Sequence, residues 1–437
     1  ARHDDRLTLD PARATVVRRT SPATQSRHAR ERTGVSTTFV IVGAGMAGGK
    51  AVETLRDEGF DGRVVLVGAE PERPYERPPL SKDYLRGEQE RAKVYLQEAG
   101  WYAEHDVELR TGVTVERLDL AQRSVVLTGG ESIAYDALLL ATGAEPRRPP
   151  IPGADLDGVH VLRTLADSDG LRAVLDRGGR LAVVGGGWIG CEVAASARQR
   201  GLDVTVIEPA ELPLLRVLGP ELGAFYRDVH AEHGVRLALG TGVEAIEGSG
   251  RAERVRTSDG ATIDCDAVVL GVGVTPRTAL AEGVLDVDNG ILVDASLRAS
   301  VDGVYAAGDV ANHDHPLLGR VRVEHWANAL EQGPTAARAM LGQDVVYDRV
   351  PYFFSDQYDV GMEYAGLSEP GDEVVFRGDP ATREFVAFWL RDGRVTAGMN
   401  VNVWDVNEHI QELVRSRATV DRARLVDPDV PLETLVA

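Results

Sequence analysis

Residues 38–48 read TFVIVGAGMAG. Its first five residues form a short apolar run with several β-branched side chains, which predicts a buried parallel strand. In the GxGxxG pattern that follows, Gly43 permits a tight turn, Gly45 lets the backbone approach a pyrophosphate, and Gly48 lets a helix to about residue 58 pack on the sheet. A second strand over residues 63–67 completes the unit, and Glu70 at its end supplies a carboxylate for a ribose hydroxyl.

The same β-α-β pattern returns at residues 181–190, LAVVGGGWIG. Its fingerprint glycines are Gly185, Gly187 and Gly190, and a helix to about residue 200 and a strand over 203–207 follow them. Glu208 at the end of that strand favours NADH, because its charge repels the 2′-phosphate of NADPH and no arginine immediately follows. Two complete units predict two bound dinucleotides: a flavin that stays bound and a nicotinamide that binds and leaves. The alternative is a duplicated fold in which one of the two sites binds no dinucleotide.

Composition restricts the class of protein. A chain of 437 residues, 43% of them hydrophobic, suggests two to four domains. The net charge of −20 argues against a nucleic-acid binder, whose binding face is basic. No apolar run approaches the ~20 residues that span a bilayer, so we expect no membrane segment. Only two cysteines occur, too few for a disulfide framework, and a reducing cytoplasm is the expected setting.

We predict an α/β fold with two Rossmann-like dinucleotide-binding domains and a C-terminal α+β domain. The FAD-binding domain is expected to be discontinuous, over residues 37–152 and 278–345, with the NAD-binding domain at 153–277. Residues 346–437 form the C-terminal domain, with strands such as 384–390 and 394–399 and a closing helix near 406–416. Residues 1–36, rich in arginine and poor in apolar runs, predict a disordered extension; a targeting peptide is the alternative.

Four further motifs carry a resemblance to a known family. The ATG of residues 141–143 and the VYAAGD of 304–309 resemble the other two signatures of the two-dinucleotide flavoprotein reductases. RPYERPPLSK at 73–82 and PYFFSDQY at 351–358 narrow the match. Together they resemble the oxygenase-coupled ferredoxin reductases, which include the reductases of ring-hydroxylating dioxygenases. The likeness runs from residue 37 to the C-terminus, and apoptosis-inducing factor is a more distant relative.

The resemblance implies hydride transfer from NADH to FAD, then single-electron transfer to a ferredoxin, another small iron–sulfur protein or a rubredoxin-type protein. It also implies that Lys82 and Glu192 form an ion pair beside the reactive flavin edge, and that Asp309 hydrogen-bonds the ribityl or pyrophosphate part of FAD. The other residues expected to contact the cofactors are Arg77, Thr142, Gly143, Gly308, Trp326, Gln332 and Phe354. For Trp326 and Phe354 a place in the core is an equal alternative.

Two other functions stay open. One is a non-catalytic, NADH-responsive flavoprotein resembling apoptosis-inducing factor. The other, a thiol-dependent peroxidase or disulfide reductase, is disfavoured because residues 74–83 contain no cysteine, Cys191 is expected to be a small buried thiol, and Cys265 looks inert.

Residues 1–36 carry +4 of the net charge, which leaves −24 on the rest. Docking of an acidic ferredoxin would therefore need a local basic patch.

Overall fold

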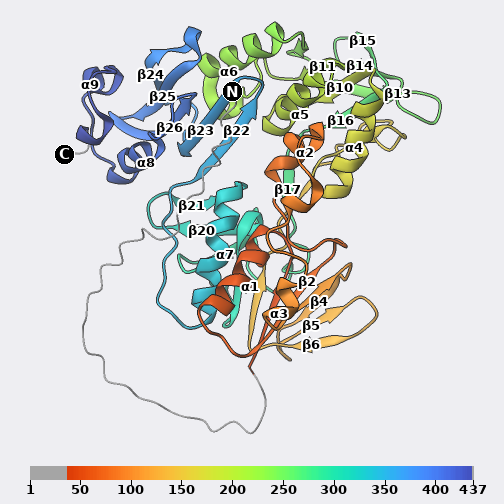
Figure 1. The fold of residues 1–437 in the computed structure, drawn as a ribbon, viewed down its shortest axis with the longest axis vertical. Helices are drawn as coiled ribbons and strands as arrows, with labels where there is room; N and C mark the ends of the chain where they lie inside the picture. The colour runs from red at the N-terminus through yellow and green to blue at the C-terminus, as the bar shows by residue number, and fades with distance from the viewer. Residues whose placement is uncertain (1–36, 436–437) are drawn as a thin grey trace. The chain divides into compact units, whose positions relative to one another are not determined.

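A computed structural model describes residues 37–435 (Figure 1). The predicted extension over residues 1–36 lies outside these described residues. The first sheet is parallel, with the order β19-β7-β1-β2-β3. Its strands are β1 (Thr38–Val42), β2 (Arg63–Gly68), β3 (Val107–Thr111), β7 (Ala137–Leu140) and β19 (Val304–Ala306). Helix α1 (Met46–Asp57) follows β1 and contacts α7 (Trp326–Met340), so the chain returns to this sheet late in the sequence.

The second sheet is also parallel, with the order β12-β11-β10-β16-β9. Its strands are β9 (Val159–His160), β10 (Arg180–Val184), β11 (Asp203–Glu208), β12 (Arg236–Leu239) and β16 (Ala267–Leu270). The helices of this unit are α4 (Leu165–Arg177), α5 (Trp188–Gln199) and α6 (Leu215–Glu232). Strands β10 and β11, like β1 and β2, pair in parallel from the first residue of each strand, and in both cases one helix joins the two strands.

The third large sheet is antiparallel, with the order β22-β23-β26-β25-β24. It contains β22 (Tyr352–Gln357), β23 (Val360–Gly366), β24 (Glu373–Asp379), β25 (Glu384–Arg391) and β26 (Arg394–Val401). Helix α8 (Asn407–Ser416) packs on β26 and β23, and α9 (Arg422–Val426) packs on β24. The three sheets confirm the predicted fold class, whereas the exact domain boundaries stay a prediction.

One apolar cluster joins the antiparallel sheet to the second unit. Leu218 and Tyr226 of α6 and Cys191 of α5 pack with Met362 and Phe385 of the sheet. Leu218 and Phe385 are fully buried, and each such apolar side chain contributes about 1.5–3 kcal/mol through burial. This packing fixes β22 beside α5, which matters for the site described below.

Shorter elements complete the described part of the chain. Three-stranded sheets are formed by β4 (Val115–Asp119), β5 (Ser124–Leu127) and β6 (Ser132–Ala134), by β13 (Val243–Glu247), β14 (Arg254–Thr257) and β15 (Thr262–Asp264), and by β18 (Ile291–Val293), β20 (Ala311–His315) and β21 (Gly319–Arg322). Strand β8 (Ala144–Pro146) pairs with β17 (Val274–Pro276), and the short helices include η1 (Pro78–Ser81), α2 (Asp83–Arg86), α3 (Trp101–Glu104) and η3 (Gly308–Val310). Within residues 37–435, no helix is long and apolar enough to cross a membrane.

Candidate functional site: two dinucleotide sites joined by a buried ion pair

The glycine loop after β1 is built for close backbone approach. Gly43 has a φ of +115°, and a Cβ there would lie 2.1 Å from the carbonyl oxygen of Ala141. A Cβ on Gly48 would lie 2.0 Å from the oxygen of Gly43, so the helix can sit this close only because Gly48 has no side chain. Gly45, in contrast, faces open space, with nothing within 4 Å of its Cβ position. The start of α1 is therefore open to a ligand, and free N–H groups there favour phosphate.

Two segments from elsewhere in the chain meet this loop. The loop after β7 carries Thr142 and Gly143, and the tight fit of Gly43 against Ala141 holds it beside the glycine loop. Gly308 follows β19 with a φ of +78°, and its N–H donates to Gln332 Oε1 over 2.8 Å. The three motifs predicted for the FAD site thus come together at the carboxyl ends of parallel strands, where ligands bind in open α/β sheets. Thr142 Oγ1 itself donates to the carbonyl oxygen of Arg277.

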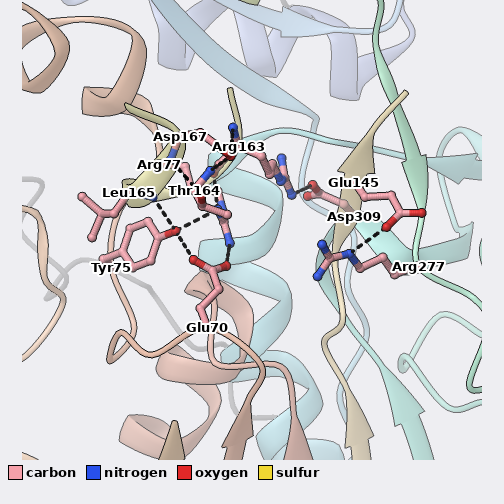
Figure 2. A network of polar contacts seen from close by, with 10 residues as sticks. All are labelled: Glu70, Tyr75, Arg77, Glu145, Arg163, Thr164, Leu165, Asp167, Arg277 and Asp309. Atoms are coloured by element: carbon pink, nitrogen blue, oxygen red, sulfur yellow. Dashed lines mark hydrogen bonds and ion pairs between the residues drawn. The ribbon is translucent and has the colours of Figure 1, made fainter. Parts of the chain in front are cut away.

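Asp309 and Glu70 belong to a polar network that sequence reasoning identified only in part (Figure 2). Asp309 Oδ2 accepts from Arg163 Nη2 over 2.5 Å, and Asp309 is 7% exposed. Arg77 Nη2 pairs with Glu70 Oε1 at 2.9 Å, and a second nitrogen of Arg77 donates to the carbonyl oxygen of Arg163. Arg163 thereby links the two ends of the predicted FAD site, yet nothing in its sequence context distinguishes it from a surface arginine.

Glu70 lies two residues beyond β2, which ends at Gly68, rather than at the strand end as predicted. Its second oxygen accepts from the Tyr75 hydroxyl over 2.5 Å. Burial alone would raise the pKa of Glu70, but the charge of Arg77 and the hydrogen bonds outweigh burial, so its pKa lies below the usual value. The carboxylate is thus held ionised, with lone pairs left to accept from a ribose hydroxyl.

Lys82 and Glu192 meet in the interior. Lys82 Nζ lies 2.8 Å from Glu192 Oε2, and the two side chains are 9% and 5% exposed. Lys82 follows η1, while Glu192 lies in the first turns of α5, so the pair joins the two dinucleotide-binding units. The Ser81 hydroxyl also donates to Glu192 Oε2. The predicted ion pair is present in the structure, and it is shielded from solvent.

Two aromatic side chains lie near the ion pair of Lys82 and Glu192. Lys82 Nζ is 5.8 Å from the centre of the Phe354 ring, and Phe354 lies edge-on to Trp326 with ring centres 6.0 Å apart. Buried nitrogens without a hydrogen-bond partner in the described residues include Trp326 Nε1, His325 Nδ1 and Arg163 Nε. An unpaired buried polar group costs about 1–3 kcal/mol. These nitrogens, and the open space at Gly45, fit a bound FAD, because FAD offers hydrogen-bond acceptors along its length. His325 could not be predicted from the sequence.

The second glycine loop borders a cavity of about 360 Å³. Gly187 faces open space, whereas a Cβ on Gly190 would lie 2.0 Å from the oxygen of Gly185. Glu208 lines the cavity, and its two oxygens accept from the N–H groups of Gly186 (2.7 Å) and Ala210 (2.9 Å). These residues fit the adenosine half of a nicotinamide dinucleotide. Sequence reasoning missed Arg216, which reaches the same cavity from α6.

Neither cysteine is placed for redox chemistry. Cys191 and Cys265 are each 1% exposed and free. Burial raises the pKa of the Cys265 thiol to about 11 and raises that of Cys191 well above its usual value. Because the thiolate is the reactive form, both groups are unreactive near neutral pH.

Comparisons with known proteins agree with this geometry. Residues 37–333 match the pyridine nucleotide-disulphide oxidoreductase family, and residues 352–436 match the reductase C-terminal family. The ferredoxin reductase subunit of 5,5′-dehydrodivanillate O-demethylase from a Sphingobium strain is 43% identical over 406 residues, covering 91% of this chain and 98% of that protein. The ferredoxin–NAD(+) reductase component of the anthranilate 1,2-dioxygenase system of Burkholderia cepacia is 41% identical over 404 residues, covering 91% and 99%.

Among solved structures, the fold is similar to that seen in the covalent putidaredoxin reductase–putidaredoxin complex. The TM-score is 0.88 at 35% sequence identity, and the match covers 92% of this chain and 98% of that one. The match therefore includes the C-terminal sheet as well as both dinucleotide-binding units.

Proposed function

Because the chain belongs to the pyridine nucleotide-disulphide oxidoreductase family, and within it to the oxygenase-coupled ferredoxin reductases that its motifs resemble, we propose that it carries electrons from NADH through FAD to a ferredoxin-type iron–sulfur protein. That partner in turn feeds a monooxygenase or a dioxygenase. The observation that carries the proposal is the buried ion pair of Lys82 and Glu192, which lies where the two dinucleotide-binding units meet.

FAD, when bound, accepts the hydride and releases electrons singly; the chain supplies binding, orientation and electrostatics. Lys82 holds a positive charge in a site that is nearly closed to water. Such a charge stabilises the negative charge that develops as hydride arrives. Glu192, 2.8 Å away, keeps the ammonium in place. Because Glu192 lies on α5 of the second dinucleotide-binding unit, it would also contact the nicotinamide. Phe354 lies beside Lys82, and Trp326 packs edge-on against Phe354.

Three residues of the polar network in Figure 2, Glu70, Arg163 and Asp309, would hold the rest of the flavin. The open start of α1 would receive the pyrophosphate, and Glu70 would accept a hydrogen bond from the adenosine ribose. Asp309 would hydrogen-bond the ribityl or pyrophosphate part of FAD, and the free Nε of Arg163 would add a donor beside it. In the second unit, the cavity at Glu208 receives the adenosine half of NADH.

Electrons leave directly from the flavin, since both thiols are buried and protonated. The relatives at 43% and 41% identity are named as ferredoxin reductases of an O-demethylase and a dioxygenase system, and this supports a ferredoxin as the acceptor. NADH is made and consumed inside cells, and this supports a cytoplasmic location for the reaction.

A panel of purified ferredoxins and rubredoxins tests the proposal. The holoprotein is mixed with NADH, each candidate acceptor and cytochrome c, and cytochrome c reduction is followed. We expect rapid reduction that depends on a [2Fe–2S] ferredoxin. Fast reduction of rubredoxin alone would replace the proposed partner, and no turnover with any acceptor would favour a slow, NADH-responsive flavoprotein instead.

A further inference from the structure

A line of buried polar side chains leads away from Glu192 on the side opposite Lys82. Glu192 Oε1 accepts from the Ser355 hydroxyl over 2.7 Å. Ser355 Oγ in turn accepts from Gln357 Nε2 over 3.2 Å, and Gln357 Oε1 lies 2.9 Å from His230 Nε2. The Tyr358 hydroxyl lies 3.3 Å from His230 Nδ1 and ends the line.

Three parts of the fold supply these residues. Glu192 is on α5, His230 is on α6, and Ser355 and Gln357 are on β22 of the antiparallel sheet. Ser355, Gln357 and His230 are each 1% exposed. Polar groups this deeply buried are costly unless every one is paired, so a complete line of hydrogen bonds restricts the geometry strongly.

The chemistry of the groups fixes the direction of each hydrogen bond. Gln357 Oε1 can only accept, so the hydrogen of the neutral imidazole must be on His230 Nε2. His230 Nδ1 then accepts from the Tyr358 hydroxyl. Burial lowers the pKa of His230 to about 4, which agrees with a neutral ring. Every donor in the line therefore points toward the Glu192 carboxylate, and each bond polarises the next.

The line is unsuited to moving protons. The amide of Gln357 interrupts it, because an amide N–H is not acidic enough to pass a proton on. What remains is an oriented set of dipoles that ends on a carboxylate oxygen, while Lys82 and Ser81 occupy the other oxygen.

We propose that Ser355, Gln357 and His230 are positioning residues that hold the Glu192 carboxylate aimed at Lys82, so that the antiparallel sheet helps to set the reactivity of the flavin. The proposal rests on the proposed function only in that FAD binds beside Lys82. The identity of the electron acceptor plays no part in it.

The test uses the FAD-loaded, full-length protein and two variants. Ser355→Ala removes the donor to Glu192, and Gln357→Met cuts the line one step further away at similar volume. Ser296→Ala is the matched control, because Ser296 is also buried but donates to the carbonyl oxygen of Val345, outside this site. Flavin reduction by NADH is measured in anaerobic stopped flow, and the midpoint potential of bound FAD is measured by equilibrium dye titration without NADH.

We expect Ser355→Ala to slow flavin reduction about tenfold and Gln357→Met about threefold, with FAD content unchanged. The midpoint potential should become more negative in both, because the charge on Glu192 is less well compensated. In a Glu192→Gln background, Ser355→Ala should have no further effect. A Ser355→Ala protein that matches Ser296→Ala in rate and potential would overturn the proposal. An equal loss with and without the Glu192 charge would also overturn it. Neither result depends on whether the native protein reduces a ferredoxin.

Discussion

Removing the charge of Lys82 should lower both the stability of the protein and the rate of flavin reduction by NADH. The substitution Lys82→Met keeps most of the volume and leaves the Glu192 carboxylate buried without its partner, 5% exposed. Breaking one side of a buried ion pair costs about 3–5 kcal/mol of stability. The hydroxyls of Ser81 and Ser355 still donate to Glu192, so we expect the lower end of that range, about 3 kcal/mol.

The rate effect follows from the same burial. Loss of one preorganised group that stabilises developing charge costs about 2.7–4 kcal/mol of barrier, or about 100- to 1,000-fold in rate. Lys82 is only 9% exposed, so water can replace little of its effect. The matched control is Lys50→Met. Lys50 pairs with Glu53 at 2.6 Å, but these side chains are 24% and 22% exposed, and such pairs contribute at most about 1 kcal/mol.

The assay combines anaerobic stopped-flow bleaching of the flavin by NADH with urea unfolding of the same samples. The double variant Lys82→Met, Glu192→Gln should recover most of the lost stability, because no charge is then left unpaired, but it should remain slow. Bleaching at the native rate in Lys82→Met, with native FAD content, would refute the role given to Lys82. A double variant as unstable as the sum of the two single variants would refute the coupling.

Three further outcomes are expected. Glu208→Gln should weaken NADH binding roughly 10- to 150-fold, which is equivalent to about 1.5–3 kcal/mol for a hydrogen bond to a charged group. In kcat/KM measurements it should also narrow the preference for NADH over NADPH. A native protein that already prefers NADPH would show the assignment of Glu208 to be wrong. The double variant Cys191→Ser, Cys265→Ser should keep most of its NADH-dependent ferricyanide reduction, since both thiols are buried and protonated; fast flavin reduction without acceptor reduction would indicate a thiol relay. Arg163→Ala should release FAD about tenfold more readily in ultrafiltration, whereas Arg180→Ala, which breaks an exposed pair with Asp266 in the second unit, should not; equal retention in both would remove Arg163 from the flavin site.

Local rules were enough to predict both dinucleotide-binding units. Buried parallel strands read as short apolar runs, and the glycines at 43–48 and 185–190 leave few alternatives for the turn that follows. The strand predicted over 38–42 is β1, Thr38–Val42, and the strand predicted over 203–207 is β11, Asp203–Glu208. Glu70 shows the limit of these rules, because the loop after β2 is set by contacts with Tyr75 and Arg77 rather than by strand propensity.

The parts of the site that could not be predicted depend on contacts between distant segments. Arg163 meets Asp309 across 146 positions of sequence, and Ser355 meets Glu192 across 163. No local pattern marks a serine on an amphipathic strand as the partner of a helix carboxylate. The ion pair of Lys82 and Glu192 is predictable only because the surrounding motifs resemble a known family.

The number of ferredoxin molecules reduced per NADH shows whether electrons pass from NADH through FAD to the partner. FAD-loaded protein in catalytic amount is mixed anaerobically with limiting NADH and excess oxidised [2Fe–2S] ferredoxin, and both absorbances are followed to completion. NADH yields a pair of electrons and each cluster accepts one, so we expect two reduced ferredoxins for each NADH consumed. A flavin that bleaches while the ferredoxin stays oxidised would contradict it.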